Sequence, residues 1–154
     1  MGLFSKKIQI KAPINGKLID ITEVKDEAFS SKALGDGMAI IPSEGKVYAP
    51  VDGEVITMID TNHAIGLLAG GVEILIHIGM DTVRLGGKYF KAHVKEGDKV
   101  KAGTLLIEFE KEEVEKEYDI TSPIIISNYS ELKSLTKTDP REVNTTEIIM
   151  TAVK

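Results

Sequence analysis

The chain has 154 residues, of which 42% are hydrophobic and 5 are proline, and its net charge is −5 at pH 7. These values predict a single globular domain over residues 1–154, with residues 1–8 as a flexible N-terminus. The chain has no cysteine, which excludes disulfides, cysteine-ligated zinc and thiol catalysis and favours a reducing compartment, the cytoplasm. The acidic balance argues against nucleic acid as a partner, and no apolar run is long enough for membrane insertion.

Two similar segments occupy the first third of the chain. KAPINGKLI at residues 11–19 is echoed by YAPVDGEVI at residues 48–56. In each copy the proline favours extended backbone, Asn-Gly or Asp-Gly makes a tight turn, and an alternating strand follows. The pattern predicts an internal structural repeat. Residues 23–34 between the copies are polar and predict a loop that contains a helical turn.

The central stretch holds two of the three histidines of the chain. The apolar runs at residues 64–68 and 72–78 predict a β-hairpin, with residues 69–71 (AGG) as a three-residue loop. In that register His63 lies opposite His77, with Cβ atoms about 5 Å apart. A loop of two or four residues would instead place the two imidazoles on opposite faces.

The chemical meaning of this histidine pair remains open on physical grounds alone. A single histidine in an apolar strand is commonly a core residue whose ring nitrogens are satisfied. Two histidines that converge among aliphatic side chains are costly to bury without a use. They could share a phosphoryl group or a metal ion.

The remainder of the chain is rich in turns and short strands. Residues 95–109 predict two strands and two turns, residues 111–118 a helix, and residues 122–127 and 147–153 two further strands. About ten or more short strands are thus expected, with turn signals every 8 to 12 residues or so. The predicted fold class is all-β, an antiparallel sandwich or barrel-like domain with short helical turns.

Several longer motifs extend over nearly the whole chain: Ala12-Pro13 with Gly16, LGDG at 34–37, APVDG at 49–53, TNHA at 61–64, VEILIHIGMDTV at 72–83, and Ser122-Pro123. With these motifs the chain resembles the glucose-type enzyme IIA family of the bacterial phosphoenolpyruvate-dependent sugar phosphotransferase system. Residues 139–146 (DPREVNTT) depart from the family, because they lack the Gly-Asp turn that many members have there.

The resemblance implies a phosphocarrier. His77 would accept a phosphoryl group from the carrier protein HPr and pass it to the enzyme IIB domain of a sugar permease. His63 would stabilise the phosphoryl oxygens, and Thr61 would orient His63 through its other ring nitrogen. Asp81, four residues past His77, could orient groups near the site or cap the following turn.

The resemblance also implies a docking surface. Phe29, Leu34, Ile59 and Leu75 would line a shallow apolar depression around the histidines, where partners and regulatory target proteins bind. No cofactor is required for the transfer. His63 and His77 could hold zinc when a partner supplies a further ligand, since two ligands are an incomplete site.

Other functions remain open at this point. His77 and Asp81 have the i, i+4 spacing of metal ligands, so His63, His77 and Asp81 could form a zinc hydrolase site. The protein could also be purely regulatory, with phosphorylation of His77 only as a signal. Part of the chain resembles biotinyl and lipoyl domains, but the attachment lysine in its usual setting is missing.

Overall fold

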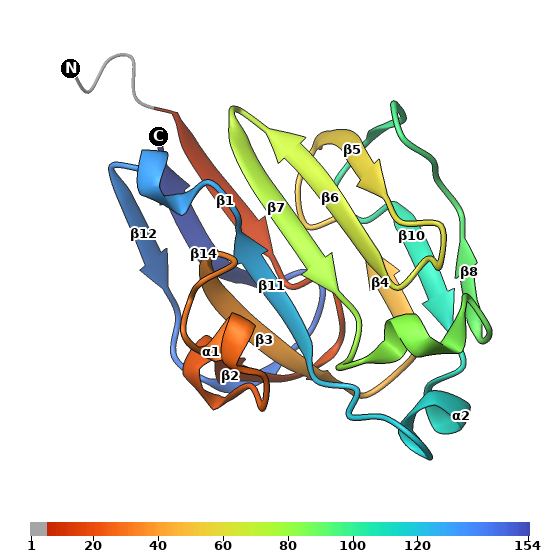
Figure 1. The fold of residues 1–154 in the computed structure, drawn as a ribbon. Coiled ribbons are helices and arrows are strands. Elements are labelled where there is room, and N and C mark those ends of the chain that lie inside the picture. Colours follow the sequence, from red (N-terminus) through yellow and green to blue (C-terminus); the bar gives the residue numbers. More distant parts are fainter. Residues whose placement is uncertain (1–5) are drawn as a thin grey trace.

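The computed structural model describes residues 6–154 and consists of three antiparallel β-sheets (Figure 1). The strands are β1 (Lys7–Lys11), β2 (Gly16–Asp20), β3 (Asp36–Pro42), β4 (Lys46–Tyr48), β5 (Gly53–Met58), β6 (Ala64–Ala69), β7 (Val72–His77), β8 (Phe90–Ala92), β9 (Lys99–Val100), β10 (Leu105–Phe109), β11 (Ser122–Ile126), β12 (Ser134–Lys137), β13 (Arg141–Val143) and β14 (Ile148–Val153). The helices are α1 (Glu27–Ser30) and α2 (Lys111–Glu115), with 3-10 turns η2 (Ile21–Glu23), η3 (Thr82–Leu85) and η4 (Tyr129–Glu131).

The large sheet has eight strands in the order β13-β2-β3-β11-β7-β6-β5-β9. Two small sheets have three strands each, in the orders β1-β14-β12 and β4-β10-β8. The strand pairings are antiparallel throughout these sheets. The predicted all-β fold class is therefore confirmed.

The main core lies between the large sheet and the two small sheets. It joins Ile40, Ile65, Ile76 and Ile124 of the large sheet to Ile10 and Ile149 of one small sheet and to Val47 and Leu106 of the other. In β7 the residues alternate, since Val72, Ile74 and Ile76 are buried whereas Glu73, Leu75 and His77 are partly exposed. Strand pleating thus turns His77 away from the main core.

The two similar segments bond to each other although their strands lie in different parts of the large sheet. Their strands β2 and β5 begin at Gly16 and Gly53 and both belong to the large sheet. The Lys11 N–H donates to the Pro50 carbonyl oxygen at 3.0 Å, and the Tyr48 N–H donates to the Pro13 carbonyl oxygen at 2.8 Å. The predicted repeat is confirmed, and its two copies bond to each other.

The β6–β7 hairpin differs from the prediction by one residue. Ala69 pairs with Val72 and Ala64 pairs with His77, so the loop is only Gly70-Gly71. Both glycines have positive φ, 55° and 81°. A two-residue turn of this kind matches the right-handed twist of its strands and needs positive φ at both positions, which two glycines supply. The predicted three-residue loop is therefore wrong.

Two further boundaries differ from expectation. Lys7 and Ile8 pair with Val153 and Ala152 in β1, so the expected flexible N-terminus is wrong for these two residues. Residues 1–5 lie outside the described part of the chain. The helix expected over residues 111–118 is shorter, because α2 ends at Glu115.

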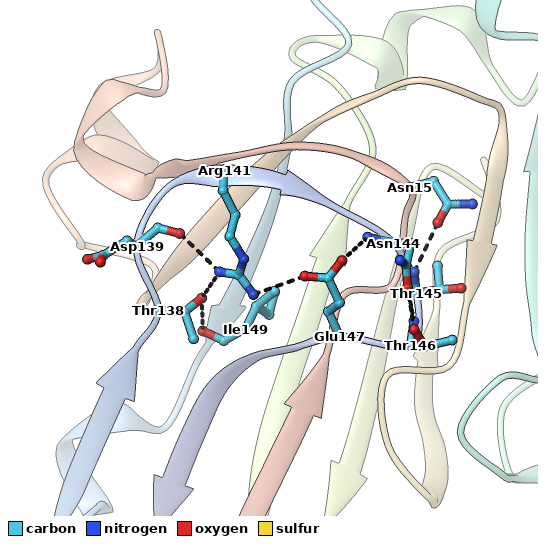
Figure 2. Close-up of polar contacts among 9 residues, drawn as sticks. All are labelled: Asn15, Thr138, Asp139, Arg141, Asn144, Thr145, Thr146, Glu147 and Ile149. Atoms are coloured by element: carbon cyan, nitrogen blue, oxygen red, sulfur yellow. Dashed lines mark hydrogen bonds and ion pairs between the residues drawn. The ribbon is translucent and has the colours of Figure 1, made fainter.

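Residues 138–147 close the domain without a Gly-Asp turn (Figure 2). Arg141 donates from Nη1 to Thr138 Oγ1 at 2.7 Å and from Nη2 to Glu147 Oε2 at 3.2 Å. The Thr145 N–H donates to Asn15 Oδ1 at 2.9 Å. These bonds tie the chain between β12 and β14 to the beginning of β2, so side chains replace the missing turn. Within residues 6–154, no helix is long and apolar enough to cross a membrane.

Candidate functional site

His77 is the last residue of β7, and its side chain points away from the main core, on the outer face of the large sheet. Its Nδ1 lies 2.9 Å from the carbonyl oxygen of Gly79. Because a carbonyl oxygen can only accept, Nδ1 carries the proton of the neutral ring. The other nitrogen, Nε2, therefore holds the lone pair and is the nucleophilic atom.

His63 lies one residue before β6, directly after Asn62, whose φ is 57°. Its side chain is 4% exposed, and its Nδ1 lies 2.5 Å from Thr61 Oγ1. The ring centroids of His63 and His77 are 5.0 Å apart, with planes at 85°. The two rings therefore meet edge to face.

The meeting of these rings contradicts the rule used for the prediction. Ala64, not His63, pairs with His77, and a two-residue loop was expected to separate the imidazoles. That expectation is wrong because His63 lies outside the strand. The left-handed Asn62 redirects the backbone there, so strict side-chain alternation does not apply.

Burial keeps both imidazoles neutral near pH 7. It lowers the pKa of His63 from 6.5 to about 4, and the neighbouring His77 adds to this effect. Burial also lowers the pKa of His77, against the opposing effects of the Gly79 hydrogen bond and of the carboxylates of Asp26 and Asp81. A neutral His77 keeps its lone pair available for attack.

Asp26 was not singled out in the sequence. Its carboxylate accepts a hydrogen bond from the Ala28 N–H at 2.9 Å and so caps α1. The available signal was an aspartate at the start of the predicted helical turn, but its nearness to His77 depends on the tertiary fold. Asp81 is exposed and has a φ of 60°, and its side chain makes no capping bond to η3.

The structure relates two of the four predicted apolar residues, Phe29 and Leu75, to the neighbourhood of His77. The ring of Phe29 is 5.2 Å from that of His77, centroid to centroid, and Leu75 packs against the same cluster. Ile59 accepts the Asn62 N–H in the turn that leads to His63. Leu34 follows α1 and is 46% exposed. The outer cluster beneath this surface comprises Ile19, Ile21, Val24, Phe29, Ala39, Met80 and Ile125.

The same histidines provide few ligands for a metal. In the part of the chain that the structure describes, no group of three or more His, Cys, Asp and Glu side chains could hold a metal ion. The hydrolase alternative needs His63, His77 and Asp81 as joint ligands, and this set is not formed. Two imidazoles fall short of the four ligands that zinc normally takes.

Two neutral histidines, one with a free Nε2, meet at an apolar surface on an antiparallel β-sandwich. This combination defines a histidine phosphocarrier domain. The chain belongs to the family described as phosphoenolpyruvate-dependent sugar phosphotransferase system, EIIA 1, whose model matches residues 8–132. The family expected from the motifs is thereby confirmed, and with it the assignment to phosphoryl transfer.

Individual relatives agree with this assignment. The glucose-specific EIIA component of Halalkalibacterium halodurans is 43% identical over 147 residues, which cover 94% of this chain and 85% of the relative. The beta-glucoside-specific EIIBCA component of the same organism is 48% identical over 141 residues, 90% of this chain but only 22% of the relative. The chain thus spans about a fifth of the length of that relative.

A solved structure shares the fold. The glucose permease IIA from Mycoplasma capricolum superposes with a TM-score of 0.87 at 37% sequence identity, over 95% of this chain and 96% of that chain. The similarity therefore extends over nearly the whole of both chains.

Proposed function

We propose that His77 carries a phosphoryl group on Nε2, accepts it from HPr and passes it to the IIB domain of a sugar permease. The observation that carries this proposal is the 2.9 Å hydrogen bond between His77 Nδ1 and the Gly79 carbonyl oxygen. It leaves Nε2 as the one ring nitrogen with a free lone pair. His77 is only partly buried at the end of its strand, which is consistent with access by a partner.

The transfer balances without a cofactor. The Nε2 lone pair of His77 attacks phosphorus, the phosphorus–nitrogen bond of the donor phosphohistidine breaks, and its electron pair stays on the departing imidazole. The proton on Nδ1 of His77 remains in place. The positive charge that develops on the ring is stabilised by the Gly79 carbonyl and by the nearby carboxylates of Asp26 and Asp81.

His63 would stabilise the charge on the phosphoryl oxygens. With 2.5 Å between Thr61 Oγ1 and His63 Nδ1, a Thr61 hydroxyl that donates to Nδ1 leaves the proton of the neutral ring on Nε2. That N–H can then donate to a phosphoryl oxygen on His77. Positioning and charge stabilisation are the main requirements of phosphoryl transfer.

The surface around the pair would dock the partners. Leu34, Ile59 and Leu75 would supply apolar contact above the buried Phe29, and the net charge of −5 favours a basic partner face. Regulatory target proteins would use the same surface, and a target that supplies a carboxylate could complete a zinc site with His63 and His77. We place the protein in the cytoplasm, because phosphoenolpyruvate is an intracellular metabolite.

The test is the intact mass after incubation with phosphoenolpyruvate, enzyme I and HPr. The wild type should gain one phosphoryl group, and His77→Ala should gain none. His63→Gln should still accept the group but pass it slowly to an added IIB domain. A wild type that gains no mass, or a His77→Ala variant that does, would refute the proposal. A wild type that is phosphorylated but never discharged by any IIB domain would instead indicate a purely regulatory protein.

A further inference from the structure

The turn that follows His77 is held by two fully buried hydroxyl groups that the transfer itself does not use, those of Thr82 and Ser122. Thr82 Oγ1 donates to the Ile78 carbonyl oxygen at 2.5 Å. The Gly79 N–H donates to Ser122 Oγ at 3.4 Å. Both polar atoms of the peptide group between Ile78 and Gly79 are therefore bound by side chains.

The direction of the Ser122 bond is determined by its other partner. The Ser122 hydroxyl donates its own proton to the Ile120 carbonyl oxygen at 2.8 Å. Its oxygen is then left as the acceptor for the Gly79 N–H. Ser122 thus connects the beginning of β11 to the turn after β7, and its only proton is already committed to the Ile120 carbonyl oxygen.

The next peptide group is fixed as well. The Met80 N–H donates to the Asp119 carbonyl oxygen at 2.8 Å, while the Gly79 carbonyl oxygen accepts from His77 Nδ1. Gly79 has a φ of 74°, and a Cβ at this position would lie 2.7 Å from Thr82 Cγ2 and 2.9 Å from the Asp119 oxygen. The crowding restricts position 79 to glycine, and the Met80–Asp119 hydrogen bond restrains the peptide group that carries the Gly79 carbonyl.

We propose that Thr82 and Ser122 are positioning residues that aim the Gly79 carbonyl at His77 and thereby hold the ring proton on Nδ1. In the other tautomer the Nδ1 lone pair would face the lone pairs of the carbonyl oxygen, and the hydrogen bond would be lost. As long as the carbonyl stays in place, this tautomer is disfavoured. The two hydroxyls act on the reactive nitrogen through the backbone, without touching the phosphoryl group.

The inference rests on the proposed function for its effect on rate, but its primary test does not. The ring nitrogens of His77 are observed by ¹⁵N NMR at neutral pH in the wild type, Thr82→Val, Thr82→Ser and Ser122→Ala. Valine keeps the shape of threonine but removes the hydroxyl, whereas serine keeps the hydroxyl and removes the methyl group. Val114→Ala, in α2, serves as a control for a general loss of stability, because Val114 is fully buried but supplies no hydroxyl to the turn.

Thr82→Val and Ser122→Ala should each raise the ratio of the Nε2–H to the Nδ1–H tautomer about tenfold, the change that a hydrogen bond of about 1.4 kcal/mol corresponds to. Thr82→Ser and Val114→Ala should keep the wild-type signature. The rate of phosphoryl acceptance from phosphorylated HPr should fall in parallel with the loss of the Nδ1–H form.

An unchanged His77 tautomer in folded Thr82→Val and Ser122→Ala would overturn the inference, as would an equal shift in Val114→Ala. If the tautomer shifts as expected but the wild type accepts no phosphoryl group, the positioning stands and the proposed function fails. The two failures are therefore distinguishable.

Discussion

Acid should destabilise this protein through His63 before its carboxylates are protonated. The pKa of His63 is about 4 in the folded protein, compared with an ordinary value of 6.5 that applies to the unfolded chain. Below pH 6.5 the unfolded chain therefore gains a proton that the folded protein does not, so the free energy of unfolding falls as pH falls. Each pH unit costs about 1.4 kcal/mol, which gives a loss of about 2 kcal/mol by pH 5.

The matched comparison is His63→Gln, which removes the titrating ring and keeps a polar group near Thr61. Urea unfolding of both proteins at about pH 7 and about pH 5 gives the loss for each. The wild type should lose about 2 kcal/mol more than the variant. His77, whose pKa is also lowered, adds a loss in the same direction to both proteins and cancels. Equal losses in the two proteins would refute a buried, neutral His63.

Three other changes test the site and its support. Thr61→Val removes the hydroxyl that lies 2.5 Å from His63 Nδ1 and should slow phosphoryl transfer about tenfold in quenched-flow assays, whereas Thr61→Ser should not. Phe29→Ala empties a 4% exposed position and should cost about 3 kcal/mol in urea unfolding; a cost below about 1 kcal/mol would contradict the packing described. Lys137→Met breaks the 2.5 Å ion pair with Asp36 and should cost about 1 kcal/mol, with coupling to Asp36→Asn in a double-mutant cycle rather than additivity.

The fold class was predictable from the sequence because strands and turns depend on residues that are close together in the chain. The alternation of β7 and the turns of the two repeats depend on side-chain period and on Pro, Asn, Asp and Gly, which a sequence shows directly. The hairpin register was missed because AGG allows a loop of two or three residues. Only the pairing of Ala69 with Val72 decides between them, and that pairing depends on the whole sheet.

The site itself was predictable only in part. The motifs placed His63 and His77 together, but the pleating argument behind their contact was wrong, since the left-handed Asn62 brings the rings together. Asp26 influences the pKa of His77 because the tertiary fold brings the segment before α1 near the end of β7. The hydrogen bond from the Gly79 N–H to Ser122 Oγ joins residues 43 positions apart in the chain, and no local pattern indicates such a bond.

The two ends of the described chain lie side by side, as Figure 1 shows for β1 and β14. The Lys154 N–H donates to the Lys6 carbonyl oxygen at 2.9 Å, and Lys154 Nζ donates to the Gly71 carbonyl oxygen at 3.1 Å. Both ends thus sit at the Gly70-Gly71 turn, while His77 lies at the far end of β7, about 20 Å away along the strand. A linker to another domain could therefore join this domain at either end without covering the histidines. His77 would then face away from the linker and stay open to both the donor and the acceptor protein.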